Sequence, residues 1–424
     1  MVIKRRTFLQ TGSLATASLL LPRFLKAFER PVIVPPGNKV VVVLQLSGGN
    51  DGLNTVIPVR NDIYYRERPR LGIDKAHAAM ITDEAGLHPA LTGLKGLYDD
   101  GSLGILNSVG YPNPDRSHFR SMDIWQTASD SREYIQTGWL GRYLDAQCNG
   151  CDHPTQVLEI DDVVSLALKG EKIRGMALKD PRRLYQISND KYFRDVVAGH
   201  FSQAGQTGAA TQPGAHGAAA GVDAQGKVAT GGSVDYLYKT MAETLSGADY
   251  IFEQSKLRPS TAAYPNTEIG KNLHTIASLI LSDINTRVYY LSLGSFDTHV
   301  NQAAQQQRLF SEMNDAIVAF VADLKASHRF DDTLLLTFSE FGRRVGQNAS
   351  GGTDHGTANT MFMVSGGLRQ KGLINGLPDL NDLSEGDLKY QVDFKDVYAT
   401  VLKKWLGADD RSILGRQSSY LGFI

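Results

Sequence analysis

The stretch KVVVVLQLSGGNDGLNTVIP, from Lys39 to Pro58, decides the fold of this chain. Its apolar run from Val40 to Leu46 is interrupted only by Gln45, so it does not alternate between apolar and polar residues. A continuous run of this kind is typical of a strand that is buried on both faces, in a parallel sheet covered by helices. The sequence therefore predicts an α/β fold with this strand at its centre.

Turn residues and a carboxylate follow this strand directly. Gly48 and Gly49 allow a tight turn, and Asn50 and Asp51 come next. A carboxylate at the carboxyl end of a central strand lies where open α/β sheets bind their ligands. Asn, Asp and Gly are also the usual residues of simple turns, so this fragment alone favours neither a turn nor a site.

Strands and helices are predicted to alternate along the rest of the chain. Apolar and β-branched runs predict further strands at residues 103–109, 286–293, 333–338 and 360–364. Helical spacing predicts helices at residues 89–98, 120–128, 139–146, 235–255, 268–284, 302–326 and 394–405, whereas the polar residues 61–71 are expected to form a loop. This alternation predicts a mostly parallel sheet with helices on both faces.

The net charge bears on the partners of the protein, and the first thirty residues bear on its location. The net charge of −1 gives no basic face for nucleic acid. In residues 1–30, Arg5 and Arg6 precede a short apolar run and a polar exit, which predicts a twin-arginine signal peptide, although an ordinary basic amphipathic start is the alternative. We expect a periplasmic or extracellular protein with no stable membrane span after signal removal.

Residues 31–424 are predicted to form a single domain with one flexible insertion. The insertion, at about residues 199–232, consists mainly of Gly, Ala, Gln and Ser and cannot bury enough apolar surface to order itself. The two cysteines, Cys148 and Cys151, are spaced for a local disulfide, with a redox pair as the alternative. A zinc site there would need more ligands than the neighbouring His153.

Polar clusters follow the predicted strands, and one more lies in a glycine-rich loop. Their chemistry-bearing residues are Asp51, Ser117, His118, Asp297, His299, Glu340, Arg343, Asp354 and His355. Because parallel strands end on one edge of a sheet, these groups can converge there. Carboxylates and imidazoles are the ligands that a divalent metal needs, so the joint pattern predicts a metal or anion site. His88 and His274 are expected to be structural.

Five motifs together carry a resemblance to a known family. They are LSGGNDGLNTVIP, RSHF…DIWQTA, SFDTH, SEFGR and GTDHG. The chain resembles the DUF1501 family of twin-arginine-exported proteins, which is similar to the alkaline phosphatase and sulfatase superfamily. The resemblance covers nearly the whole mature chain and implies an alkaline phosphatase-like α/β domain.

The resemblance implies roles for individual residues. Asn50 and Asp51 resemble an acidic metal-binding pair, Ser117 stands where the superfamily places its nucleophile, and Asp297, His299 and His355 resemble further metal ligands. Glu340 stands where an Asp-His pair is usual, with Phe341 in place of the histidine. This departure favours calcium, magnesium or manganese over zinc, and one metal or none over two. No Cys-x-Pro-x-Arg motif stands at Ser117, so a sulfatase formylglycine is not expected.

These observations predict an exported, metal-dependent hydrolase of small anionic phosphate or sulfate esters. The divalent metal (Zn, Mg, Mn or Ca) is expected on Asp51, Asp297, His299, Glu340, Asp354 and His355, with Asp354 orienting an imidazole. Ser117 or a metal-bound water is the expected nucleophile. Arg343 or Arg116 is expected to clamp the ester oxygens. The alternatives are a non-catalytic binding or assembly protein on the same scaffold and, third, a redox protein that uses the cysteines.

Overall fold

A computed structural model describes residues 38–147, 154–192, 195, 244–245 and 247–424. The chain divides into two compact units: residues 33–149, 154–179 and 255–424 form the main unit, and residues 1–32, 150–153 and 180–254 form the other. The predicted signal peptide, both cysteines, the insertion at 199–232 and much of the predicted helix at 235–255 lie outside the described residues. None of the described helices is both long and apolar enough to cross a membrane.

The main unit is built on a nine-stranded sheet. Its strands follow the order β11-β5-β10-β9-β1-β8-β6-β7, and β14 also pairs with β5. Their bounds are β1 (Val40–Leu46), β5 (Leu103–Gly110), β6 (Val157–Glu159), β7 (Met176–Ala177), β8 (Val288–Leu293), β9 (Thr333–Phe338), β10 (Asn359–Val364), β11 (Gly372–Leu373) and β14 (Val392–Asp393). β1 is buried along its whole length and runs parallel to both β8 and β9, which confirms the predicted central strand.

Among the described strands of this sheet, only β10 runs against the others. It is antiparallel to β9 on one side and to β5 on the other. The segment that precedes β10 therefore lies at the same edge as the carboxyl ends of β1, β8 and β9. The GTDHG motif comes before its strand, so the convergence of parallel strand ends does not by itself explain why this motif lies at that edge.

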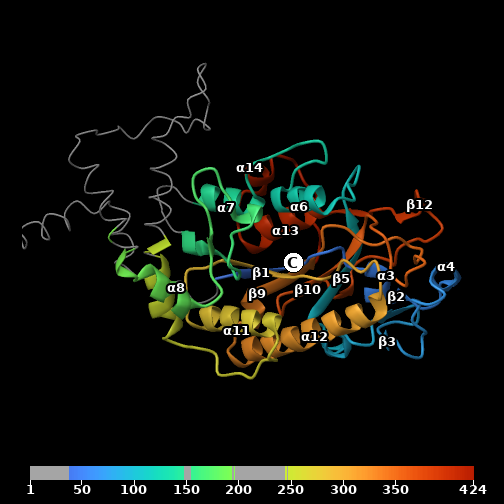
Figure 1. The fold of residues 1–424 in the computed structure, drawn as a ribbon, viewed down its shortest axis with the longest axis horizontal. Helices are drawn as coiled ribbons and strands as arrows, with labels where there is room; N and C mark the ends of the chain where they lie inside the picture. The colour runs from blue at the N-terminus through green and yellow to red at the C-terminus, as the bar shows by residue number, and fades with distance from the viewer. Residues whose placement is uncertain (1–37, 148–153, 193–194, 196–243, 246) are drawn as a thin grey trace, which may run out of the picture. The chain divides into compact units, whose positions relative to one another are not determined.

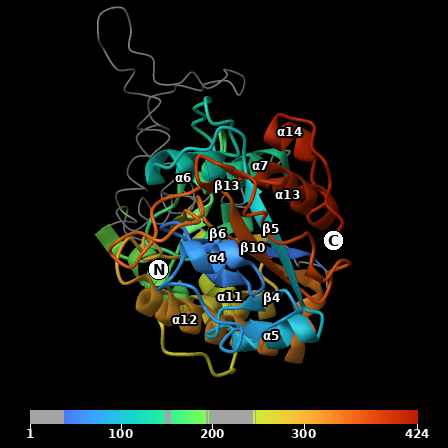
Figure 2. The same cartoon turned by 90° about the vertical axis from the view of Figure 1, so that its right-hand side faces the viewer.

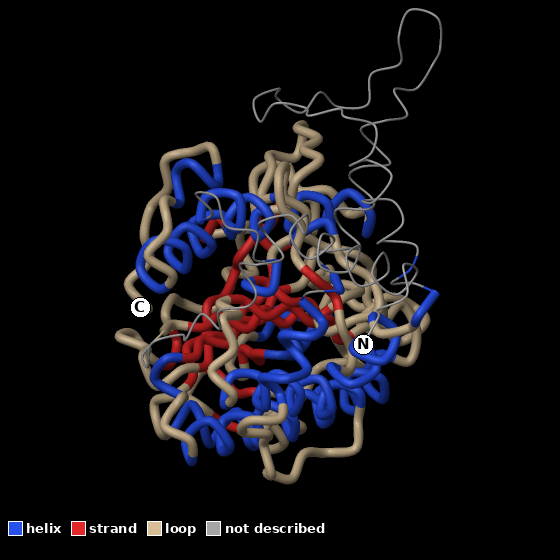
Figure 3. The backbone as a smooth tube through the Cα atoms, turned by 90° about the vertical axis from the view of Figure 1, so that its left-hand side faces the viewer, coloured by secondary structure: helices blue, strands red, loops and turns tan. Residues whose placement is uncertain are grey.

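Helices cover both faces of the sheet, as predicted (Figures 1 and 3). Figure 2 shows the layers from one end, with α6 and α13 on one face and α12 and α5 on the other. The helices of the main unit are α3 (Gly52–Thr55), α4 (Asp62–Glu67), α5 (Thr92–Asp99), α6 (His118–Thr127), α7 (Trp139–Gln147), α11 (Glu268–Leu281), α12 (Gln302–Ala326), α13 (Phe394–Thr400) and α14 (Asp410–Leu414). Shorter turns are the 3-10 helices η1 (Pro154–Gln156), η2 (Leu166–Leu168) and η3 (Phe330–Asp332) and the π-helix η4 (Val401–Trp405).

The aromatic core on one face fixes α6 and α13 against the sheet. The ring of Trp125 in α6 stacks on Phe338 of β9 and on Phe394 of α13, with ring centroids 5.1 and 4.1 Å apart. Burying such rings contributes several kcal/mol through the removal of apolar surface from water, roughly 2–3 kcal/mol for each. The last turns of α6 are thereby held against the end of β9.

One local prediction is wrong. Residues 61–71 contain α4 rather than a continuous loop, because the side chain of Asn61 accepts hydrogen bonds from the backbone N–H groups of Ile63 and Tyr64. Short strands that the sequence did not reveal form a three-stranded sheet, β2 (Val56–Pro58), β4 (Ala85–Leu87) and β3 (Ala79–Met80), and a pair, β12 (Leu383–Ser384) and β13 (Asp387–Leu388).

The described part of the other unit contains α8 (Pro181–Ser188) and parts of two further helical segments, around residues 191–195 and 244–254. Asp180 caps α8 by accepting from the backbone N–H groups of Arg182 and Arg183. Tyr185 stacks on Phe252 with ring centroids 4.0 Å apart. The prediction that residues 31–424 form a single domain stays a prediction.

Candidate metal centre

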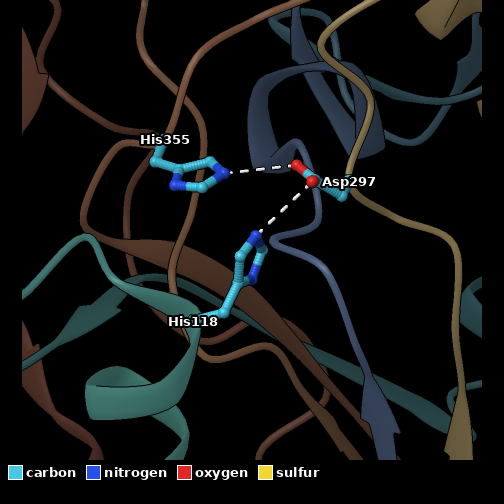
Figure 4. Close-up of side chains that lie close together, drawn as sticks. All are labelled: His118, Asp297 and His355. Carbon is cyan, nitrogen blue, oxygen red and sulfur yellow. Dashed lines mark hydrogen bonds and ion pairs between the residues drawn. The ribbon is translucent and has the colours of Figure 1, made fainter.

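Three side chains from distant parts of the chain converge at the carboxyl edge of β1, β8 and β9. His118 is the first residue of α6, Asp297 lies in the loop after β8, and His355 lies in the loop before β10. One ligand atom from each lies within 4.8 Å of the others. Figure 4 shows both imidazole rings directed at the carboxylate of Asp297.

His299 adds a third imidazole to this group. Its Nε2 atom lies 2.9 Å from His355 Nε2 and 3.1 Å from Asp297 Oδ1. His355 Nε2 lies 3.2 Å from the same carboxylate oxygen, and His118 Nε2 lies 3.5 Å from Asp297 Oδ2. We call these four residues, His118, Asp297, His299 and His355, the metal cluster.

The opposite ring nitrogens of the three histidines all face oxygen acceptors. His118 Nδ1 lies 3.0 Å from Glu340 Oε1, His299 Nδ1 lies 3.1 Å from Asp354 Oδ1, and His355 Nδ1 lies 2.8 Å from the backbone oxygen of Arg116. Carboxylates and carbonyls only accept, so each Nδ1 donates its proton. In the neutral rings each Nε2 then carries a lone pair on the side of the ring that faces the other residues of the metal cluster.

The electrostatics of the metal cluster centre on Asp297. Burial alone would raise the pKa of Asp297, but the hydrogen bond and the positive charge of the Arg343 guanidinium act against burial, and the pKa is lowered to about 2. The hydrogen bond to Glu340 raises the pKa of His118. The pKa of Asp354 is lowered, first by its hydrogen bond with Asn348 and then by that with His299. Asp297 is thus ionised at neutral pH.

Glu340 and Asp354 act on histidines in the structure. The sequence predicts both as metal ligands, and Asp354 also as a residue that orients an imidazole. Glu340 is buried, and its Oε1 accepts from Gly48 N at 2.8 Å as well as facing His118. Such carboxylate–histidine pairs fix the tautomer and direction of a metal-binding ring.

Arg343 is not available to clamp a substrate, contrary to one of the two predicted clamps. Its side chain is fully buried. Its guanidinium donates to Asp297 Oδ1 at 2.8 Å and to the backbone oxygens of Gly48, Gly49, Phe296 and Thr353. It therefore ties the loops after β1 and β8 to the loop before β10.

Asp51 does not join the metal cluster. Its buried carboxylate faces Arg68 Nη1 at 2.5 Å, accepts from Leu53 N at 3.2 Å as the N-cap of α3, and also accepts from Gln302 Nε2. The expected metal ligand is thus already paired with a cation and two other donors. A charge pair at this depth has little to gain from a second cation.

Ser117 and Arg116 lie beside the metal cluster and are both accessible. Ser117 is the exposed N-cap residue of α6, and its hydroxyl makes no capping hydrogen bond. The side chain of Arg116 is 36% exposed and pairs with Asp387. The side chains of the metal cluster itself are between 21% and 46% exposed, so small molecules can reach it.

Sequence reasoning missed two residues that shape this site and assigned no role to a third. His118 is among the groups expected to converge, but the sequence analysis does not name it as a metal ligand. Arg68 and Gln302 gave no signal, because each matters only through its contact with Asp51. Contacts of that kind depend on the folded arrangement.

Comparison with solved structures finds similar folds at low sequence identity. The lipoteichoic acid synthase LtaP from Listeria monocytogenes is 8% identical, with a TM-score of 0.38 over 91% of this chain and 78% of that chain. The phosphonate monoester hydrolase SpPMH from Silicibacter pomeroyi is 11% identical (0.36; 90% and 77%), and an alkaline phosphatase superfamily protein from Vibrio parahaemolyticus is 12% identical (0.36; 94% and 78%). At these values the likeness carries no argument about function.

No curated protein matches the chain. A family model described as "Protein of unknown function (DUF1501)" matches residues 102–419, a range that contains every member of the metal cluster but not Asp51. The chain belongs to the DUF1501 family.

Proposed function

We propose that this protein is an exported metal-dependent hydrolase of phosphate or sulfate esters, with one divalent cation held by His118, Asp297, His299 and His355. The observation that supports this most directly is the shared direction of the histidines. Two neutral rings whose Nδ1 atoms both donate elsewhere would face each other with bare lone pairs 2.9 Å apart, as His299 and His355 do. A cation between such atoms removes the repulsion.

The four residues fit a cation in both spacing and chemistry. Bonds of ~2.0–2.1 Å in a tetrahedral site separate neighbouring ligand atoms by about 3.3 Å. Asp297 Oδ1 lies 3.1 and 3.2 Å from the Nε2 atoms of His299 and His355, and Asp297 Oδ2 lies 3.5 Å from His118 Nε2. Three imidazoles and one carboxylate favour zinc or a similar first-row metal over calcium or magnesium. This replaces the preference for harder metals, which assumed that Glu340 binds the metal.

The residues around the metal cluster have separate tasks in ester hydrolysis. A bound cation would lower the pKa of a nearby nucleophile and neutralise charge on the ester. The Ser117 hydroxyl, at the start of α6, is free of a capping bond and so can attack the ester. The α6 N-terminus favours a bound anion, and Arg116 can bind its oxygens.

Metal content tests the binding step. Purified protein is to be stripped of metal, reloaded and measured by elemental analysis, together with His299→Ala, His355→Ala and the control His274→Ala. We expect about one zinc per chain in the wild type and the control, and at least tenfold weaker binding in the other two variants. Equal metal binding by all four proteins would refute the assignment.

Turnover tests the chemical step. The loaded protein is to be assayed with p-nitrophenyl phosphate and p-nitrophenyl sulfate, and kcat compared for wild type, Ser117→Ala and Arg116→Met. If Ser117 is the nucleophile, Ser117→Ala should lose at least ~100-fold in kcat, whereas attack by water should leave kcat within a few-fold. Stoichiometric metal without turnover of either ester would favour the non-catalytic binding protein.

Export by the twin-arginine pathway is the remaining part of the proposal and rests on Arg5 and Arg6. Cell fractionation of the full chain and of an Arg5→Lys/Arg6→Lys variant tests it. We expect the wild type in the exported fraction and the variant inside the cell. Export of both would exclude this pathway.

A further inference from the structure

Gln302, the first residue of α12, connects Asp51 to the two loops that carry Asp297, His299 and His355. We infer that Gln302 and Asp51 are positioning residues, which set the spacing of His299 and His355 without touching the metal. This inference rests on the metal centre proposed above. Asp51, the acidic residue that follows the central strand, thereby acts on the metal cluster through Gln302.

The side-chain amide of Gln302 is completely buried and uses both of its ends. Its Nε2 donates to Asp51 Oδ2. Its Oε1 accepts from Thr353 Oγ1 at 2.6 Å and from Thr298 Oγ1 at 3.3 Å. A single side chain thus joins the loop after β1, the loop after β8 and the loop before β10.

Asp51 fixes which way this amide points. A carboxylate only accepts hydrogen bonds, so the NH2 group of Gln302 must face Asp51 and its carbonyl must face the two threonines. Asp51 is itself held by Arg68, whose guanidinium also donates to the backbone oxygens of Val345 at 2.8 Å and Arg344 at 2.9 Å. The amide therefore has one orientation, anchored at a buried ion pair.

Both threonines lie next to, or close to, residues of the metal cluster in the sequence. Thr298 lies between Asp297 and His299, and Thr353 lies two residues before His355. A backbone hydrogen bond from Thr353 N to Thr298 O, 3.2 Å long, runs between the same two loops. Holding both hydroxyls on one oxygen keeps these loops in register. Metal sites tolerate errors of only ~0.2 Å in ligand distance, so this register controls affinity.

A purely structural role for Gln302 is the rival interpretation, and matched variants separate the two. Gln302→Leu removes both ends of the bridge, and Thr353→Val removes one hydroxyl with little change of shape. Thr353→Ser keeps that hydroxyl. Gln306→Leu is the control: it removes another buried amide one turn along α12, whose Nε2 donates to the backbone oxygen of Asp51 at 3.4 Å and not to its carboxylate.

The readouts are the dissociation constant for Co²⁺ and the visible spectrum of the Co²⁺ protein, each recorded beside a thermal unfolding curve. We expect Gln302→Leu and Thr353→Val to bind Co²⁺ about 10- to 100-fold more weakly, with an altered spectrum. Thr353→Ser and Gln306→Leu should keep the wild-type constant within about threefold, whatever their unfolding temperatures.

The outcomes distinguish this inference from the proposed function. Wild-type affinity and spectrum in folded Gln302→Leu and Thr353→Val would overturn the inference and leave the metal centre intact. Equal weakening in Gln306→Leu would also overturn it, because any buried amide would then have the same effect. A wild type that binds no Co²⁺ would instead overturn the metal centre, and with it the inference.

Discussion

Replacing Arg68 with methionine should destabilise the fold by about 3–5 kcal/mol, the usual cost of leaving one member of a buried ion pair without its partner. Arg68 and Asp51 side chains are 0% and 1% exposed, and their charged atoms are 2.5 Å apart. The variant also loses three donors, to Asn54 Oδ1 at 2.8 Å and to the backbone oxygens of Val345 and Arg344. The expected loss therefore lies towards the upper end of this range.

Urea unfolding followed by tryptophan fluorescence measures this loss in Arg68→Met, in Asp51→Asn and in the double variant. The double variant should be more stable than the sum of the two single losses predicts, by at least about 1 kcal/mol, because the single variant strands a charge that the double variant lacks. Arg66→Met, in the last turn of α4 two residues before Arg68, is the control; its arginine is 68% exposed, and the change in stability should be less than ~0.5 kcal/mol. A loss below ~1 kcal/mol in Arg68→Met, or simple additivity, would refute the reasoning.

Two further predictions concern acid sensitivity and the turn after β1. Burial lowers the pKa of His88 to about 4, below its ordinary value of 6.5. The contribution of His88 to stability is therefore complete above pH 6.5 and is lost as the pH falls towards 4. In urea unfolding, His88→Asn, which can still accept from Ala90 N, should lose less stability than the wild type between pH 7 and 5, and an equal loss would contradict this. Gly48 has a φ of +119°, and a Cβ there would lie 2.4 Å from Asp297 N, so Gly48→Ala should weaken Co²⁺ binding and lower the unfolding temperature. Gly96→Ala in α5, where a Cβ would meet nothing within 4 Å, should raise that temperature slightly, and matching effects of the two substitutions would count against the argument.

The sequence predicted best those elements whose buried residues form a long apolar run or a long helical spacing. β1 and β9 have the predicted bounds because every residue in them is buried and apolar runs mark their ends. α12 also has its predicted bounds, with Leu309, Met313 and Ile317 on its buried side. α4 was missed because its only local signal is the cap at Asn61, and strands of two or three residues such as β7 leave no period to detect.

For the site, the sequence predicted residue types and could not predict contacts. Carboxylates and histidines at strand ends indicated a metal, and Asp297, His299 and His355 do meet. Which carboxylate would face the rings depended on partners far away in the chain. Arg68 pairs with Asp51 from 17 residues away, and His118 faces Glu340 from 222 residues away. Neither pairing has a local pattern.

The position of His355 shows where reasoning from strand ends needs a second argument. The connection from β9 to β10 doubles back on itself, so that the residues after β9 pair with those before β10: Gly342 N donates to Thr357 O at 2.7 Å, and Arg344 N donates to Asp354 O at 3.0 Å. This antiparallel pairing includes a bridge between Arg343 and His355. Were β10 parallel to β9, the chain would have to cross the sheet first and the same histidine would begin its strand at the opposite edge. The direction of one strand, which its apolar residues do not encode, therefore decides whether His355 can meet His299 at all.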